Sequence, residues 1–287
     1  LVVVVLPALV PPAGAGRPDP DGGGPPSSPQ GSSHSSSREW GGQWMEKEKP
    51  GRVSPDMLAV GVAAYIQQYS AVFDVRINTI MEGLRSANEI RQSEAASELA
   101  DLLLMGNEDS LPPNLPIKEL ISSIVLLLQK EHNFELMLTA ARCLTNMLEA
   151  LPRAQPLVVE AVPYLLEKLK RIECIDVAEQ SLTALEVMSR RNGKTIMASG
   201  GIAATISHID FFSLSSQRLA FSIAANCALF VSHSDFHLVR DSLAELTQRL
   251  LIEDKRCLDS ICLLFSRLVD NMRNSPDKLR EIAGQNY

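Results

Sequence analysis

A helical pattern that returns about every 41 residues constrains the fold of this chain more than any other feature of its sequence. Four copies of the pattern share an apolar anchor residue near the middle of a helix. These anchors are Leu144, Leu185, Ala224 and Phe265. Successive anchors are 41, 39 and 41 residues apart, and an earlier copy fits at Leu99, 45 residues before the first of them. Around each anchor, apolar residues recur at three- and four-residue spacing, which indicates helices with one buried face.

Helical repeats of about 40 to 47 residues are typical of armadillo and HEAT proteins. We therefore predict an all-α fold, a right-handed armadillo/HEAT-like α-solenoid of about five repeats, preceded by a disordered N-terminal segment. Composition agrees, because 45% of the residues are hydrophobic but only 5% are aromatic, which suits close-packed helices better than a sheet sandwich. A solenoid leaves a long concave groove along its stack, so the fold favours a binding function.

Glycine and proline separate the first 55 residues from the rest of the chain. This segment holds nine of the 16 glycines and ten of the 17 prolines, so we expect residues 1–55 to be disordered. The repeat domain is expected at residues 56–287, with units at about 76–106, 117–152, 158–192, 200–232 and 236–272. Within it we predict helices at residues 57–73, 76–84, 90–105, 117–130, 134–151, 158–172, 176–191, 217–231, 236–251, 255–271 and 278–283.

Both ends of the sequence suggest a longer protein. The apolar run Leu1–Val10 has the length of a signal-peptide core but no basic residues before it, so we interpret it as an incomplete or misassigned start. The last predicted helix lacks the polar cap that closes a solenoid. We therefore expect a chain cut from a longer protein, or a truncated gene model.

Charge and hydropathy argue against two classes of partner. All of the net charge of −7 arises after residue 55, where 22 of the 27 basic and 29 of the 34 acidic residues lie. An acidic surface disfavours a nucleic-acid backbone and favours basic peptides or basic protein patches. No other stretch approaches the roughly 20 apolar residues that a membrane-spanning helix needs. We therefore expect protein partners, with no nucleic acid and no membrane.

The five cysteines do not form any CxxC pair. Cys143, Cys227 and Cys262 fall within apolar helices, where a free cysteine packs as a small hydrophobic residue. We expect packing rather than disulfide or redox chemistry, in a reducing compartment such as the cytosol or nucleus.

No motif predicts a cofactor, a metal ion or a catalytic group. His233 and His237 are four residues apart but lack the glutamate of an HExxH zinc site. Residues 192–195 end like a phosphate-binding loop, yet the motif requires a glycine where this chain has Met188. A helix-ending turn is the plainer interpretation of that segment.

Seven polar residues are candidates for contact with a partner, because they lie late on the helices expected to line the groove. They are Asn146, Glu149, Glu186, Arg190, Asn226, Arg267 and Asp270. The two asparagines could hold a peptide backbone, or could instead pack helices or cap backbone groups. The charged residues could receive a basic segment, or could form intrahelical pairs on a solvated face. The sequence leaves both alternatives open.

The loops of the chain carry a more specific resemblance than the repeat alone. The stretch 173–191, with shorter pieces spread over residues 76–273, resembles the armadillo region of HECT-type E3 ubiquitin ligases of the ubiquitin-fusion-degradation class, most of all its animal members. The shorter pieces lie at residues 105–109, 131–134, 149–153, 166–169, 200–201, 211–213, 224–227, 235–237, 246–250 and 267–271.

The resemblance implies a nuclear ligase, with the cytoplasm as a second location, whose armadillo arm docks protein substrates, ubiquitin or ubiquitin chains. It also implies a C-terminal HECT domain, in the remainder of the ligase chain, that forms a thioester between ubiquitin and a cysteine. None of the five cysteines matches that residue, so the resemblance assigns no catalytic residue here. We therefore expect a docking arm acting in protein ubiquitination and ubiquitin-dependent degradation. The alternative is a stand-alone armadillo scaffold or adaptor without transferase activity.

Overall fold

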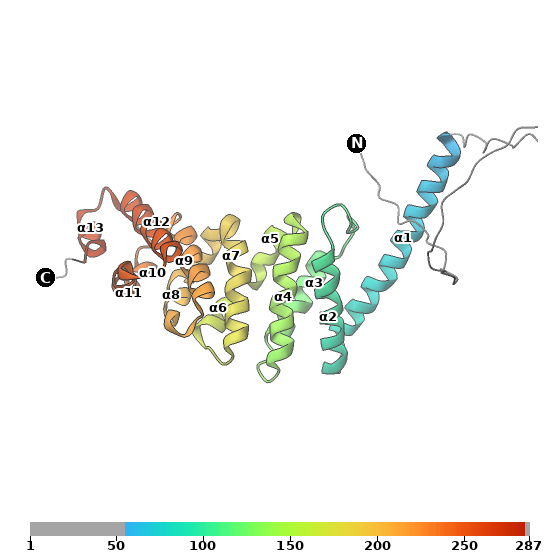
Figure 1. Ribbon diagram of the computed structural model, residues 1–287, viewed down its shortest axis with the longest axis horizontal. Coiled ribbons are helices and arrows are strands. Elements are labelled where there is room, and N and C mark those ends of the chain that lie inside the picture. The colour runs from blue at the N-terminus through green and yellow to red at the C-terminus, as the bar shows by residue number, and fades with distance from the viewer. Residues whose placement is uncertain (1–54, 285–287) are drawn as a thin grey trace, which may run out of the picture. The chain divides into compact units, whose positions relative to one another are not determined.

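The computed structural model describes residues 55–284, and every regular element in this range is an α-helix or a 3-10 helix (Figure 1). The segment 1–55, which we predicted to be disordered, lies outside this range except for its last residue, and so does the apolar run Leu1–Val10. Between residues 55 and 284, no helix combines the length and the hydropathy that a bilayer-spanning segment requires.

Long helices form the first layer of the repeat. They are α2 (Glu89–Met105), α4 (Phe134–Ala150), α7 (Ile175–Ala198), α9 (Leu214–Ala228) and α12 (Lys255–Met272). Each packs against the next in chain order, so that they follow one another along the row in Figure 1. The helix α1 (Pro55–Leu84) packs against α2 ahead of this row.

Shorter helices form a second layer against the first. Helix α3 (Ile117–Leu128) packs on α4, α6 (Val162–Lys170) on α7, and α8 (Gly201–Ile206) on α9. The remaining elements are η1 (Pro152–Ala154), α5 (Gln155–Val158), η2 (Val159–Ala161), η3 (Ile209–Phe211), α10 (His237–Arg240), α11 (Leu243–Gln248), η4 (Arg249–Leu251) and α13 (Pro276–Ile282). This two-layer stack of helices is the predicted armadillo/HEAT-like α-solenoid.

One continuous apolar core runs through the stack, and the repeat anchors lie within it. Leu99, Leu144, Leu185 and Ala224 are fully buried, and Phe265 packs partly buried against the same core. Burying a leucine side chain stabilises a fold by roughly 1.5–3 kcal/mol, so the period seen in the sequence is the period of the main stabilising contacts.

Cysteines contribute to this core, but not all of those we predicted. Cys143 and Cys227 are buried, and burial raises the pKa of each thiol to about 12. The prediction for Cys262 is wrong, because its side chain is exposed. Cys257 is the buried cysteine of α12, and it lies on the stripe of that helix that faces the core.

Polar side chains fix where most first-layer helices begin. Asn88, Asn133, Ser213 and Asp254 each accept a hydrogen bond from a backbone N–H in the first turn of α2, α4, α9 and α12. Such caps satisfy donors that a helix leaves without a partner, at about 1 kcal/mol each. Helix α7 differs, because the side chain of Cys174 before it makes no capping bond.

Four predicted helices are merged, divided or shortened in the structure. Residues 57–73 and 76–84 belong to one helix, α1, because Asp74 and Val75 between them break no helical pattern. The predicted helix 236–251 is divided among α10, α11 and η4. The predicted helix 158–172 is regular only in α6, where Pro163 occupies the first turn and its missing N–H costs little.

Helix α7 continues past its predicted end. It runs to Ala198 through a kink at Asn192, where φ is −109° and ψ is 21°. Gly193 permits close packing at this bend, because a Cβ there would lie 2.9 Å from the Phe230 ring. Gly200 then takes φ 80°, a left-handed conformation that suits glycine, and leads the chain into α8.

Ionic and polar contacts join neighbouring units at the ends of their helices. Glu89, at the start of α2, accepts a hydrogen bond from Asn133 Nδ2 at 3.1 Å and lies 2.6 Å from His132 Nε2 and 3.3 Å from Lys130 Nζ. The Asn133 bond first, then His132 and Lys130, lower the pKa of Glu89 to about 2. Similar pairs are Arg153–Glu108, Lys168–Glu131, Arg218–Asp254, Arg249–Asp210 and Arg240–Glu281.

The depressed pKa of Glu89 generates a pH-dependent prediction. The carboxylate contributes stability that is fully present above its ordinary pKa of 4.5 and is lost as the pH falls toward about 2. We expect Glu89→Gln to lower the urea midpoint of unfolding near neutral pH. The difference in urea midpoint between the variant and the original chain should become smaller as the pH falls from 4.5 toward about 2. An equal difference in midpoint at both pH values would contradict a stabilising role for the Glu89 carboxylate.

The crossing of α1 and α2 generates a second prediction. A Cβ on Gly83 would lie 2.5 Å from the Cβ of Ala95, so Gly83→Ala should force the helices apart and cost about 1–3 kcal/mol. Gly61, also on α1, has nothing within 4 Å of such a Cβ. Gly61→Ala is the matched control and should stabilise the helix by up to about 1 kcal/mol. Thermal unfolding followed by circular dichroism should move in opposite directions for the two variants.

Candidate protein-binding groove

A hollow of about 400 Å³ lies across three successive first-layer helices. Its lining residues are Leu138 and Arg142 from α4, Asp176, Glu179, Gln180 and Thr183 from α7, and Ser215, Ser216 and Leu219 from α9. No residue of the second layer lines it, so it belongs to the face of the row that the second layer leaves open. We call this hollow the central groove.

The central groove is polar and carries charges of both signs. Glu179 is already engaged, accepting the Ser213 N–H at 2.7 Å, and the Gln180 amide donates to the Thr145 hydroxyl at 3.1 Å. Arg142 and Asp176 are exposed and have no ion-pair partner within residues 55–284. A guanidinium and a carboxylate are therefore free to meet a partner, beside hydroxyl and amide groups that suit a peptide main chain.

The two candidate asparagines bind the neighbouring helix. Asn146 is 8% exposed, and its Nδ2 donates to the carbonyl oxygen of Ala100 on α2 at 2.9 Å. Asn226 Nδ2 donates to the Ser189 hydroxyl on α7 at 2.9 Å. Of the two alternatives that the sequence left open, the helix-packing role is the one that these bonds support.

Arg267 has the same kind of role one unit further on. Its guanidinium donates to the carbonyl oxygen of Ala225 on α9. Asn271, which we did not single out, donates to the carbonyl oxygen of Ala228 at 3.0 Å. In these three bonds from Asn146, Arg267 and Asn271, the donor and the acceptor carbonyl are 46, 42 and 43 residues apart in sequence, which is about one repeat. The repeat period was therefore the sequence signal that could have matched each donor to its acceptor.

Glu186 and Arg190 form an intrahelical ion pair on α7. The Arg190 Nη2 to Glu186 Oε2 distance is 2.7 Å, and Ser222 on α9 donates to the same carboxylate at 3.1 Å. The Glu186 side chain is mostly buried, whereas that of Arg190 is 64% exposed. Arg190 thus remains open to a partner, while Glu186 is committed to holding α7 against α9.

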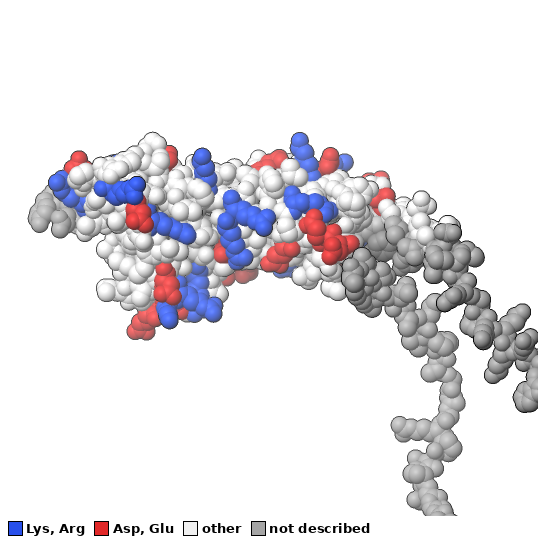
Figure 2. All heavy atoms as spheres, turned by 90° about the horizontal axis from the view of Figure 1, so that it is seen from above, with Lys and Arg blue, Asp and Glu red and all other residues white. Residues whose placement is uncertain are grey.

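Glu149 and Asp270 are the two candidate residues that are exposed to solvent and make no side-chain interaction among the described residues. Both are exposed, and neither forms a hydrogen bond or an ion pair with a side chain in the described part of the chain. Contact between these residues and a partner remains a prediction. The face seen in Figure 2 shows basic and acidic side chains interspersed, rather than a field of one sign.

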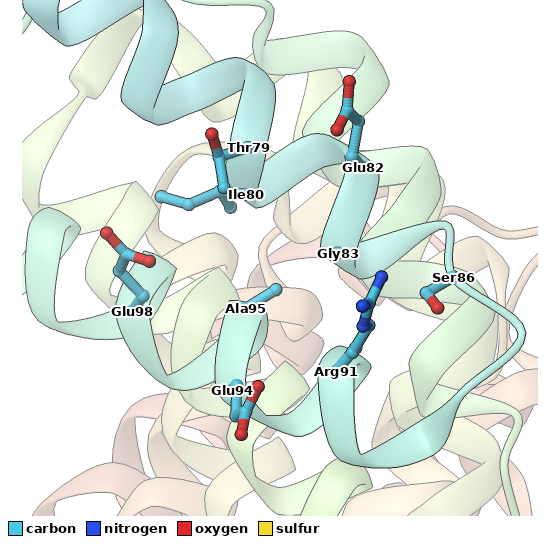
Figure 3. Close-up of a pocket in the computed structure, with 9 residues that line it drawn as sticks. All are labelled: Thr79, Ile80, Glu82, Gly83, Ser86, Arg91, Glu94, Ala95 and Glu98. Carbon is cyan, nitrogen blue, oxygen red and sulfur yellow. The ribbon is translucent and has the colours of Figure 1, made fainter.

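A second hollow, of about 370 Å³, lies between α1 and α2 (Figure 3). Glu82, Glu94 and Glu98 line it together with Arg91, and Glu98 is paired with Arg76 at 2.7 Å. In Figure 3 these charged side chains surround the place where Gly83 and Ala95 come together. Sequence reasoning missed this hollow, because it depends on the crossing of two helices rather than on a repeat position.

The two histidines weighed as metal ligands and the segment weighed as a phosphate-binding loop make ordinary contacts within the fold. His237 Nδ1 contacts the carbonyl oxygen of Ser234 and His233 contacts the Ser275 hydroxyl, so the two rings serve different neighbours. Residues 192–195 lie within α7. Among the residues that the structure describes, no three histidine, cysteine, aspartate or glutamate side chains come together as a metal site would need.

The Asn146 bond generates a testable prediction. Asn146→Ala should remove the side-chain bond that ties α4 to the Ala100 carbonyl oxygen of α2, at a cost of about 0.5–1.5 kcal/mol. Glu149→Ala is the control on the same helix, because that side chain is exposed, and it should change stability by no more than about 0.5 kcal/mol. Urea unfolding compares the two. Equal effects would mean that Asn146 does not tie α4 to α2.

The chain is similar in sequence to a known protein family and to several of its members. A sequence profile described as E3 ubiquitin-protein ligase TRIP12-like, TPR repeats, matches residues 27–197. The chain is 47% identical over 207 residues to E3 ubiquitin-protein ligase TRIP12 of Danio rerio, covering 72% of this chain and 10% of that protein. It is 29% identical over 204 residues to ubiquitin fusion degradation protein 4 of Saccharomyces cerevisiae, covering 68% of this chain and 14% of that protein.

Solved structures agree on the fold. Computationally designed armadillo repeat proteins for modular peptide recognition superpose with a TM-score of 0.58 at 17% identity, covering 72% of this chain and 87% of theirs. The profile description names TPR repeats, which are helix pairs of about 34 residues, whereas the units here recur every 39 to 45 residues and match armadillo geometry. The matched segment spans about a tenth of the zebrafish protein. By its sequence profile and its relatives, the chain belongs to the TRIP12-like family of E3 ubiquitin-protein ligases.

Proposed function

We propose that this chain is the docking arm of a HECT-type E3 ubiquitin ligase and holds a protein substrate, ubiquitin or a ubiquitin chain near a catalytic domain elsewhere in the protein. Family membership supports the ligase context, and the central groove supports the docking role. The reaction itself belongs to the remainder of the ligase, where a HECT cysteine accepts ubiquitin as a thioester. Such a ligase acts in ubiquitin-dependent degradation, in the nucleus.

The physical contribution of such an arm is effective concentration. Tethering a substrate on the same molecule as the catalytic cysteine turns a bimolecular encounter into an intramolecular one, equivalent to millimolar concentrations for short flexible links. A rigid solenoid serves this purpose, because its first-layer helices are tied to each other by bonds such as Asn146 to Ala100 and Arg267 to Ala225.

The central groove is the observation that carries the proposal. It crosses α4, α7 and α9, it is polar, and it presents Arg142 and Asp176 without ion-pair partners in the described residues. The designed armadillo proteins that share this fold are made for modular peptide recognition. An extended segment of a partner, carrying an acidic and a basic side chain, fits the two free charges.

A chimeric ligase tests the proposal. In the zebrafish relative, the matching segment is replaced by that of this chain, with the groove intact or carrying Arg142→Glu with Asp176→Lys. We expect the charge-reversed groove to reduce ubiquitin transfer to protein substrates about tenfold or more, the usual effect of losing a central binding residue. Formation of the ubiquitin thioester on the HECT cysteine should be unchanged, because the arm does not take part in that step.

The matched control is Lys118→Glu with Glu119→Lys on α3. These two exposed residues lie away from the groove, and their exchange also leaves the net charge unchanged. Equal transfer by the groove variant and this control would remove the docking role from the groove. A chimera that forms the thioester but never modifies a substrate would support the alternative, a scaffold that binds partners without serving transfer.

A further inference from the structure

The bend in α7 carries a chemically reactive pair of residues. Asn192 is followed by Gly193, and every other asparagine of the chain precedes a residue that has a side chain. In an Asn–Gly pair the backbone nitrogen of the glycine can attack the asparagine side chain, because the glycine has no Cβ to obstruct the approach. The pair therefore places a nucleophile and its target in adjacent residues.

The helix is already interrupted at this pair. Asn192 has φ −109° and ψ 21°, outside helical values, so α7 consists of a long helical stretch and a short one, residues 193–198. A stretch of fewer than two turns is not stable as a helix by itself, so it depends on its packing. Ile196 and Met197 supply that packing, because both are buried in the core.

The Asn192 side chain gains little from the closed bend. Its Oδ1 is buried and receives no hydrogen bond from any residue that the structure describes. A buried acceptor without a donor is destabilising. Opening the bend returns this oxygen to water, so the opening costs less free energy here than at a fully hydrogen-bonded turn.

Phe230, just after the end of α9, holds Gly193 in place. A Cβ on Gly193 would lie 2.9 Å from the Phe230 ring and 3.0 Å from the Asn226 carbonyl oxygen, so both groups lie close against the glycine. Attack requires rotation about the Asn192 Cα–C bond until the Gly193 nitrogen faces Cγ. These neighbours oppose that rotation, so the reaction needs the end of α7 to move away from Phe230.

We propose that the Asn192–Gly193 pair is a site of spontaneous deamidation, controlled by Phe230, that permanently releases residues 193–198 from the bent helix. The Gly193 nitrogen forms a bond to Asn192 Cγ, the Cγ–Nδ2 bond breaks, and the amide proton leaves with Nδ2 as ammonia. Water then opens the cyclic imide at either carbonyl carbon. The products are aspartate and isoaspartate at this position.

Both products disfavour the closed bend. The Asn192 oxygen that lacks a donor becomes part of a carboxylate, and a buried charge without a partner costs more free energy than a buried neutral amide. The nearest cations in sequence, Arg191 and Lys194, are exposed, so the carboxylate meets them only by leaving its buried place. Isoaspartate also adds a methylene group to the backbone, which shifts the two helical stretches out of register.

Incubation of the whole 287-residue chain in mildly alkaline buffer tests the proposal. Glutamyl endopeptidase, which cleaves after Glu186, keeps the pair in one fragment, and mass spectrometry follows the replacement of its amide by an acid. We expect the folded chain to react about tenfold or more slowly than the chain in urea, because the bend must open first. Asn192→Gln should abolish the reaction, since a glutamine forms the larger ring far more slowly.

Phe230→Ala should raise the rate in the folded chain about threefold or more, toward the rate in urea. Two variants are controls and should react at the original rate. Phe211→Ala removes an exposed ring that is not a close neighbour of Gly193, and Asn146→Ala weakens a different junction, between α4 and α2. An equal increase in all three variants would indicate global unfolding and overturn the proposal.

The original chain alone also decides the matter. Backbone amides of residues 193–198 should exchange hydrogen faster than those of residues 182–189, and equal protection would contradict local opening of the bend. Equal deamidation rates with and without urea would remove the control by Phe230. A folded chain that never reacts while the unfolded chain reacts completely would overturn the site itself.

The reacted chain tests the structural consequence. Its added negative charge separates it from the original chain on an ion-exchange column. Trypsin should then cleave at Lys194 severalfold faster in the reacted chain, because residues 193–198 no longer hold a helical conformation. Equal cleavage of the two chains would mean that the bend closes again after the reaction, against the proposed release.

Discussion

Side-by-side packing of the first-layer helices is the constraint on which the rest of the structure depends. Each of α4, α7 and α9 is pressed between the long helix before it and the long helix after it, and no unit closes a core alone. Leu144 and Leu185 owe their complete burial to these neighbours. The central groove and the polar contacts between units both exist because the helices stand in this row.

Periodicity predicted the fold well because the same contacts recur in each unit. The anchors Leu99, Leu144 and Leu185 were identifiable in the sequence and are central in the core. Helix ends were less predictable where the local sequence does not specify them. Helix α1 continues through Asp74, because no helix-breaking residue lies there, and α7 bends at Asn192 but continues to Ala198. Those outcomes depend on packing partners that lie outside the local sequence.

None of the seven residues predicted to contact a partner lines the central groove, which lies over the earlier turns of α4, α7 and α9. Asn146 and Glu186 were placed on the correct helices, yet both are committed to neighbouring helices. Which carbonyl Asn146 meets depends on the register between α4 and α2, which a single sequence does not state. Likewise, helical spacing cannot tell which of two adjacent phenylalanines is exposed, and only the structure shows that Phe212 is buried whereas Phe211 is exposed.

The length of α1 gives the first junction a mechanical role. A helix of 30 residues is about 45 Å long, and among the side chains of α1 that the structure describes, those that join the core begin at Phe73. The earlier part, with Val60 exposed, is a stiff rod attached to the stack near Gly83 and Ala95. A sideways force on that rod acts through a long lever arm on the α1–α2 crossing. Tension from preceding chain therefore loads the first unit of the solenoid before any other.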